Sequence, residues 1–241
     1  MDSVLGDIDR EQSKMQTDIA NLNRHYEKLQ GYVSQHVQQS TIEWARLVTD
    51  HPKALLLIVE TTRIVDEHGY SYGGESEPIR FTALPLASSG EVWDQLLHPT
   101  HSKAIMGTEY HGLTMVDLEN RPLLADAWPH IQETLEGHHI IIFSADFARG
   151  ALQSIYQTHI LDSPYCLHNK CKEYYNQFYD LSLEKILSYQ GIDTRRDELK
   201  DSKTRVLALA QVVRNLAAGM IKQSQKSEAS DTIDDLDEHP F

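Results

Sequence analysis

The chain of 241 residues has few cysteines and no long apolar run. Cys166 and Cys171 are its two cysteines, so we expect no disulfide framework of the kind that holds small secreted domains together. No apolar run reaches the ~18 residues of a membrane-spanning helix, and the N-terminus lacks the apolar core of a signal peptide. We therefore expect a cytoplasmic protein without a membrane segment. With 40% hydrophobic residues, the chain can hold one good-sized core plus extensions.

Positive charge is scarce as well. Lys and Arg total 22 against 36 Asp and Glu, which gives a formal net charge of −14. A surface of that sign repels phosphate backbones at long range. The composition therefore argues against strong non-specific binding to nucleic acid, although it is compatible with a local basic patch.

Cys166, His168 and Cys171 are too few for a structural metal site. Structural zinc usually needs four ligands, and the chain has no second pair of cysteines. We expect these side chains to be used in ordinary packing, and we expect no metal or other cofactor here.

Residues 1–50 are expected to form one long helix with a coiled-coil seam. Apolar residues recur at alternating steps of three and four, the spacing of a and d heptad positions. The seam is Leu5, Ile8, Gln12, Met15, Ile19, Leu22, Tyr26, Leu29, Val33 and His36. The pattern favours dimerisation through Met15, Ile19, Leu22, Tyr26, Leu29 and Val33, with a second copy or another coiled-coil partner and in either orientation. The alternative is one amphipathic helix folded back on its own domain.

The last part of this helix contains a possible cap and a stop signal. Ser40 or Thr41 could cap a separate continuation. His51-Pro52 should end the helical stretch, because the residue before a proline is pushed out of the helical region.

Residues 53–220 read as a mixed α/β domain. Strands are expected at Lys53–Glu60, Ile79–Ala87, Glu91–His98, Ile140–Phe143 and Tyr165–His168. Helices are expected near Ser102–Tyr110, Ala125–Glu136, Arg149–Ile160, Asn169–Phe178, Leu181–Gln190 and Lys203–Met220. Three strands followed by strands alternating with helices indicate a mixed sheet with helices on both faces. Residues 223–241 are polar and charged without periodicity, and we expect them to be disordered.

The first strand ends in a recognisable motif. Ala54-Leu55-Leu56-Leu57-Ile58-Val59 leads into Glu60-Thr61-Thr62-Arg63. This resembles the first motif of the DEDD 3′→5′ exonucleases, the RNase T and DNA polymerase III epsilon family, which reads Asp-x-Glu-Thr-Thr-Gly. The resemblance implies a ribonuclease H-like fold. Here Ile58 stands at the position of the metal-binding Asp, and Arg63 at that of the Gly.

Three further stretches carry the same resemblance. Tyr110-His111-Gly112-Leu113-Thr114 is similar to the family's Ile-His-Gly-Ile-Thr. In the second motif the family's Asn is replaced by Ser144 and its terminal Asp by Ala148. The third motif, His-x-Ala-x-x-Asp, matches best at residues 206–211, which puts Val206 at the general-base His and Gln211 at the metal-binding Asp.

These replacements predict an inactive enzyme. Two-metal hydrolysis needs several carboxylates holding two divalent ions ~4 Å apart, plus a base for the attacking water. Of the four acids that the resemblance implies, Glu60 alone remains. We interpret Glu60 as a vestige that bonds to a neighbouring hydroxyl or a helix N-terminus. The alternative is a divergent Mg²⁺- or Mn²⁺-dependent exonuclease that uses Glu60 and Asp146.

The C-terminus ends in an acidic peptide closed by Pro-Phe. It resembles the tip of bacterial single-stranded DNA-binding protein, which docks replication and repair enzymes. A terminal carboxylate, a ring held by proline and flanking acids suit a basic pocket. The expected partner-binding residues are Asp234, Asp235, Asp237, Glu238, Pro240 and Phe241. The other interpretation is an acidic solubility tail.

Three functions follow from these features. The first is an inactive exonuclease-fold adaptor or nucleic-acid-binding subunit of a DNA- or RNA-processing complex, dimerised by residues 1–50 and recruiting partners through residues 223–241. The second is the divergent active exonuclease. The third is a structural subunit of a nucleoprotein assembly that makes no nucleic-acid contact of its own.

Overall fold

A computed structural model describes most of the chain up to residue 220. The described residues are 2–63, 76–87, 90–143, 148, 165–177 and 181–220, with side chains from residue 14 onward. Within these ranges no helix is both long and apolar enough to cross a bilayer. The acidic peptide at residues 223–241 and the helix expected at Arg149–Ile160 lie outside the described residues.

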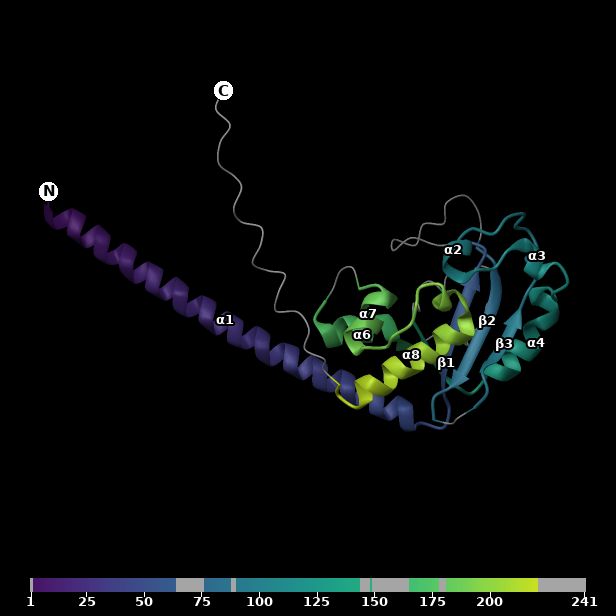
Figure 1. Cartoon of the computed structure of the whole chain (residues 1–241). Coiled ribbons are helices and arrows are strands. Elements are labelled where there is room, and N and C mark those ends of the chain that lie inside the picture. The colour runs from purple at the N-terminus through teal and green to yellow at the C-terminus, as the bar shows by residue number, and fades with distance from the viewer. Residues whose placement is uncertain are drawn as a thin grey trace, which may run out of the picture.

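The described strands form one mixed sheet in the order β3-β2-β1-β4-β5 (Figure 1). They are β1 (Ala54–Thr61), β2 (Pro78–Pro85), β3 (Trp93–Leu96), β4 (His139–Ile142) and β5 (Tyr165–Cys166). The first three are antiparallel neighbours, whereas β1, β4 and β5 run parallel. The parallel strands place the carboxyl ends of β1 and β4 at the same edge of the sheet.

Strand β1 is the centre of the fold because it is apolar on both faces. Leu55, Leu57 and Val59 belong to the core on one side, and Leu56 and Ile58 to the core on the other. Burial on both faces explains why this segment reads as a continuous apolar run rather than an alternating one.

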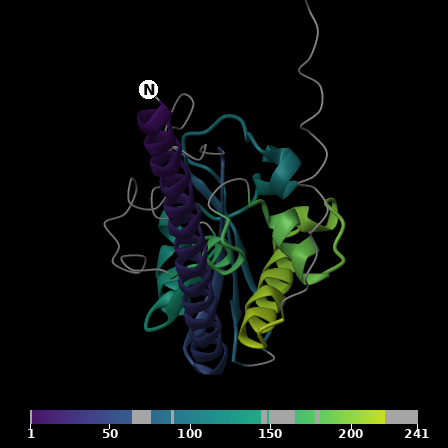
Figure 2. The same cartoon turned by 90° about the vertical axis from the view of Figure 1, so that its left-hand side faces the viewer.

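Helices cover both faces of the sheet (Figures 1 and 2). They are α1 (Asp2–Asp50), α2 (Thr108–His111), α3 (Met115–Leu118), α4 (Leu124–Leu135), α6 (Leu167–Tyr175), α7 (Leu183–Gln190) and α8 (Ser202–Ala217), with a 3-10 turn η1 (Glu198–Lys200). Residues of α4 join the core on the Leu57 side. Residues of α8, α6, α7 and the C-terminal part of α1 join the core on the Ile58 side.

Helix α1 is one uninterrupted helix that projects far beyond the sheet (Figure 1). Ser40 and Thr41 do not cap a new helix, because both lie inside α1 and the Thr41 hydroxyl donates to the carbonyl of Val37 at 3.1 Å. The expected stop at His51-Pro52 is confirmed, since the helix ends at Asp50. The helix does not fold back along its length on its own domain.

The helix expected at Ser102–Tyr110 is largely wrong. Only Thr108–His111 is helical, because the preceding backbone is bonded to other segments. The amides of residues 100–102 donate to the Glu77 carboxylate at 2.7–3.1 Å. The amide of Met106 donates to the carbonyl of Thr62 at 2.8 Å. These donors are used by tertiary contacts and are not available to a helix.

The other expected elements occur with shifted ends. Strands β2, β3 and β5 are shorter than the expected Ile79–Ala87, Glu91–His98 and Tyr165–His168. Helix α6 starts earlier than expected because the chain turns into it directly after β5. Helices α7 and α8 start at capped positions, where Ser182 accepts from the Lys185 amide and Asp201 from the Thr204 amide.

Candidate functional site

Ile58 and Glu60 share one face at the end of β1. Residues two apart on a strand point to the same side, and this side faces α8. In the antiparallel pairing Ile58 lies opposite Thr82 and Glu60 opposite Arg80. Glu60 is 8% exposed, so its carboxylate requires partners inside the protein.

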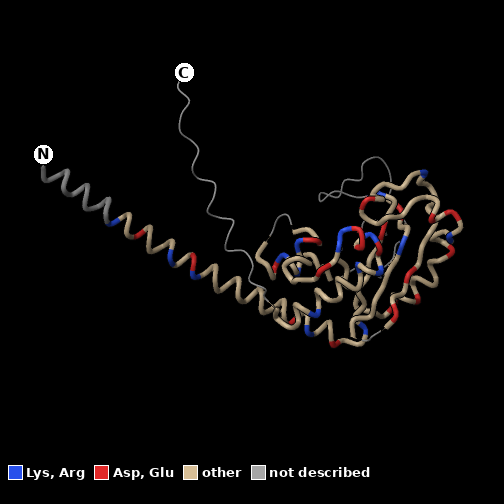
Figure 3. The backbone as a smooth tube through the Cα atoms, in the orientation of Figure 1, with Lys and Arg blue, Asp and Glu red and all other residues tan. Residues whose placement is uncertain are grey.

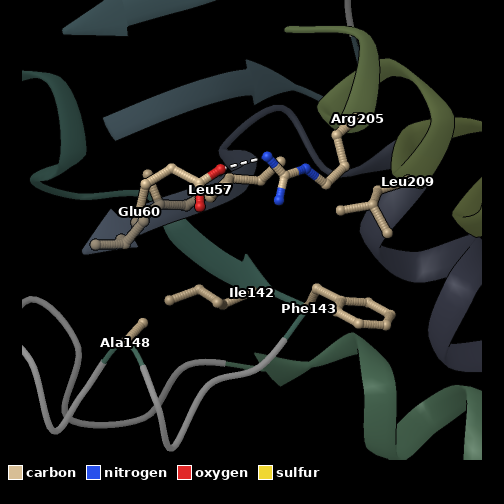
Figure 4. A pocket seen from close by; sticks show the side chains of 9 residues that line it. Leu57, Glu60, Ile142, Phe143, Ala148, Arg205 and Leu209 are labelled. Atoms are coloured by element: carbon tan, nitrogen blue, oxygen red, sulfur yellow. Dashed lines mark hydrogen bonds and ion pairs between the residues drawn. The ribbon is translucent and has the colours of Figure 1, made fainter. Parts of the chain in front are cut away.

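A cavity of about 170 Å³ opens beside these residues, between β1, β4 and α8 (Figure 4). Three positions singled out from the sequence, Ile58, Glu60 and Ala148, are brought together here. The full lining is Leu57, Ile58, Val59, Glu60, Ile142, Phe143, Ala148, Arg205 and Leu209. Seven of these nine side chains are apolar, and the two charged ones are bonded to each other.

The Glu60 carboxylate is engaged by the first turns of α8. Arg205 forms an ion pair with Glu60 Oε1 through Nη2 (Figure 4), and the side chains are 10% and 15% exposed for Glu60 and Arg205. Ser202 Oγ donates to the same oxygen at 2.7 Å and accepts from Arg205 at 3.3 Å. The negative charge of Glu60 is therefore already paired with the positive charge of Arg205.

Further charges hold the start of α8 against the sheet. Arg80 donates to both oxygens of Asp94 at 2.7 and 3.0 Å and reaches Asp201 at 3.4 Å. Burial raises the pKa of the Asp94 carboxyl, but the hydrogen bonds from Arg80 and Thr82 and the Arg80 charge lower it to below the ordinary value. Asp94 is therefore ionised at neutral pH, and the network fixes the helix that carries Arg205.

Val206 and Gln211 do not line the cavity. Val206 lies on the core-facing side of α8 and is fully buried. Gln211 is exposed, and its side-chain amide donates to Asn215 Oδ1 at 2.8 Å. The α8 residues that do line it are Arg205 and Leu209, which are four apart and so share one helix face. The cavity is therefore reached by the Arg205 and Leu209 face of α8, and the match of residues 206–211 to the third motif stays a prediction.

The Tyr-His-Gly-Leu-Thr segment builds a turn. The buried His111 accepts from the Leu113 amide at Nδ1 (3.1 Å), and its Nε2 lies 3.3 Å from the Met106 carbonyl. Gly112 has φ +70°, in the left-handed region that favours glycine. Thr114 and Asp117 form a capping box for α3. These bonds give the residues of the motif a structural role in shaping the turn between α2 and α3.

Glu77 was not found by sequence reasoning. It is 6% exposed and accepts three consecutive amides, those of Thr100, His101 and Ser102. Its own amide donates to Thr62 Oγ1 at 3.1 Å, and the Ser102 hydroxyl bonds to that same oxygen at 3.1 Å. The second threonine of Glu-Thr-Thr therefore helps to hold residues 102–106 at the end of β1.

Cys171 and His168 are used in packing. Cys171 is fully buried, and burial, with a contribution from Cys166, raises the pKa of its thiol to about 12. His168 Nε2 lies 2.8 Å from the Leu181 carbonyl. Among the described residues, no group of three or more His, Cys, Asp or Glu is arranged to hold a metal ion.

The described lining of the cavity does not supply the ligands for the pair of divalent ions that the exonuclease resemblance implies. Two ions need several oxygen donors, and Glu60 is the one carboxylate in the described lining. Arg205 places a positive charge where a cation would have to bind, and Ile58 and Ala148 offer no donor atoms. Ser144 and Asp146 lie outside the described residues, as do Asp234, Asp235, Asp237, Glu238, Pro240 and Phe241.

Comparison with known proteins was made by sequence and by structure. No protein-family model and no curated protein sequence matches the chain. Its structure is similar to the nuclease domain of 3'hExo, a DEDDh family member solved bound to rAMP, with TM-score 0.55 and 14% identity over 73% of this chain and 100% of that domain. It is also similar to a full-length 3'-exonuclease (TM-score 0.53, 12% identity, 70% of this chain and 62% of the other). A third similar structure is the cell-death related nuclease CRN-4 (TM-score 0.50, 16% identity, 70% and 65%).

At such low identities these likenesses define the fold. The chain has a ribonuclease H-like exonuclease fold, in which a mixed sheet is flanked by helices and preceded by a long N-terminal helix. This confirms the fold expected from the sequence motifs.

Proposed function

We propose that this chain is an exonuclease-fold protein that does not cleave nucleic acid and works as an adaptor. The observation that carries the proposal is the Glu60–Arg205 ion pair in a cavity otherwise lined by apolar side chains. An active site of the two-metal type uses that carboxylate to hold a cation. Here the carboxylate holds an arginine of the same chain.

Two further observations favour an adaptor over a nucleotide-binding module. The cavity of about 170 Å³ is smaller than the ~300–1,000 Å³ of typical small-molecule sites. Basic and acidic positions are also interspersed along the folded domain (Figure 3), and the formal net charge is −14. Neither supports tight binding of a phosphate backbone.

A nuclease assay tests the loss of activity. Labelled single-stranded DNA and RNA are incubated with the wild-type protein in Mg²⁺ and in Mn²⁺, beside a Glu60→Ala variant and an active 3′→5′ exonuclease. We expect the substrates to stay intact with both forms of this protein, because one ion-paired carboxylate cannot assemble two metals. Circular dichroism confirms that the variant is folded at the assay temperature.

Degradation by the wild type that disappears in Glu60→Ala would overturn the proposal in favour of the divergent enzyme. If the substrates stay intact, a gel-shift assay with the same DNA and RNA distinguishes a nucleic-acid-binding subunit from an adaptor that makes no nucleic-acid contact. Retarded bands would show that the protein binds nucleic acid, whereas free probe at all protein concentrations supports an adaptor without such contact.

The C-terminal peptide is the proposed recruiting element, on the basis of its sequence. An enzyme that binds the tip of single-stranded DNA-binding protein should be retained by immobilised wild-type chain and lost when Pro240 and Phe241 are deleted. The matched control deletes Ala229 and Ser230, which shortens the segment equally but preserves its end. Equal retention by both deletion variants would contradict docking through the Pro-Phe terminus.

A further inference from the structure

Helix α1 uses two different faces along its length. Its C-terminal part packs on the domain through the buried residues Thr41, Ala45 and Val48. Two hydrogen bonds fix it there, from Gln38 Nε2 to the Tyr174 carbonyl at 2.9 Å and from Arg46 Nε to the Ala217 carbonyl at 2.8 Å. The docked half of the helix is thus held rigidly to α6 and α8.

The other half carries an apolar ridge that the domain does not cover. We call this ridge the free seam. It comprises Met15, Ile19, Leu22, Tyr26, Leu29 and Val33, each between 52% and 67% exposed. Figure 1 shows this part of α1 extending away from the sheet. Most helical stability in proteins comes from packing of an amphipathic face, and a contiguous apolar ridge marks an interaction surface.

The free seam and the docked stripe lie on different, nearly opposite faces of α1. Continuing the heptad spacing past Val33 gives His36, Ser40, Glu43 and Leu47, and all four are exposed. This line of α1 is therefore not covered by the domain.

We infer that the free seam pairs with the same seam of a second copy of this chain, in parallel and in register. The a positions include the β-branched Ile19 and Val33, while the d positions include Leu22 and Leu29. β-Branched residues at a combined with leucine at d favour two-stranded parallel coiled coils.

The flanking positions permit pairing between identical helices. Gln16, Asn23 and Gln30 occupy the e positions. In a parallel dimer each g side chain meets the e side chain five residues further along the other helix. Asp18 then meets Asn23 and His25 meets Gln30, so no like charges oppose each other, and no strong charge pattern selects a different, oppositely charged partner.

The parallel arrangement has a consequence for the folded domains. Because α1 is continuous and docked at its C-terminal end, both domains stand at the same end of the coiled coil, one on each helix. The dimer presents two copies of the domain side by side and so supplies bivalent binding. This inference is independent of whether the cleft cleaves nucleic acid.

Molar mass by light scattering tests the pairing. The wild type should have twice the mass of the chain, and Leu22→Glu/Leu29→Glu should be monomeric, with a dissociation constant raised at least ~100-fold. The control, Asn21→Glu/Gln35→Glu, adds the same charge at c positions and should stay dimeric. An unchanged thermal transition of the domain shows that the seam variant is folded. A monomeric wild type, or dimeric seam variant, overturns the inference.

Cysteine cross-linking tests the orientation. Met15→Cys and Val33→Cys, each alone under mild oxidation, should form a disulfide-linked dimer, because identical residues face each other in a parallel in-register pair. The wild type gives the background from Cys166 and Cys171. An antiparallel pair would cross-link only when the two variants are mixed, and that outcome would refute the proposed orientation.

Discussion

Glu60→Gln should lower the free energy of unfolding by about 3 kcal/mol, because it leaves Arg205 as an uncompensated buried charge. Both side chains are at least 85% buried and share Ser202 as a third partner. Removing one member of such a pair costs more than the pair contributes, since the remaining charge keeps its desolvation penalty. Urea denaturation monitored by circular dichroism measures the change.

An exposed pair of the same chemistry provides the matched control. Glu184 and Arg196 approach to 4.0 Å with side chains 53% and 71% exposed. Glu184→Gln should therefore change stability by less than about 0.5 kcal/mol. The double variant Glu60→Gln/Arg205→Met should recover most of the loss, because it removes the unpaired charge as well.

Urea denaturation in the presence of Mg²⁺ or Mn²⁺ distinguishes an ion pair at Glu60 from a metal site. A carboxylate that binds Mg²⁺ or Mn²⁺ in the folded state would make the wild type more stable as the ion is added. The ion pair predicts no such increase, and a large cost for Glu60→Gln at all ion concentrations. Metal-dependent stabilisation that vanishes in Glu60→Gln would contradict the structural role given to this residue.

The sequence was most informative where burial alone dictates the pattern. The apolar run before Glu60 predicted β1 because a central strand is buried on both faces. Pro52 predicted the end of α1 because proline excludes the helical conformation from the preceding residue. Both are local effects that a short stretch of sequence contains in full.

The face of α8 that meets the cavity shows where a local pattern is not sufficient. Helix α8 is apolar over most of its circumference, with Val206 and Leu209 both in the core, so its composition does not say which face meets the cavity. Glu60 is 142 residues from Ser202 and 145 residues from Arg205 in sequence, and it meets them only after the sheet and helix pack. The cap at Asp201 was an available signal for the start of the helix, and it places Ser202 and Arg205 near that start.

Glu77→Gln should destabilise the protein by about 3 kcal/mol at neutral pH. The carboxylate accepts the amides of Thr100, His101 and Ser102. A neutral amide at this position has one acceptor oxygen and presents its own donors to the remaining backbone N–H groups. Each buried donor left without a partner costs about 1–3 kcal/mol. Thermal and urea denaturation measure the loss.

Asp117→Asn is the control, because Asp117 also accepts a backbone amide, that of Thr114 at 2.7 Å, but it is exposed. Water can replace the lost bond there, so the expected cost is about 1 kcal/mol or less. A similar loss in the two variants would mean that burial of the amides at residues 100–102 is not what makes Glu77 important.

The pH dependence of the stability difference between wild type and Glu77→Gln tests whether the charge of Glu77 is the cause. Burial raises the pKa of the Glu77 carboxyl, but the hydrogen bonds from Ser102, Thr100 and His101 together lower it to below the ordinary value. An unfolded glutamate binds its proton near pH ~4.3, so the folded state holds the charge to lower pH. This stabilisation is present in full above that pH and is lost as the pH falls through the folded pKa. The gap in stability between wild type and Glu77→Gln should therefore shrink below about pH 4, whereas a constant gap would assign the effect to shape rather than charge.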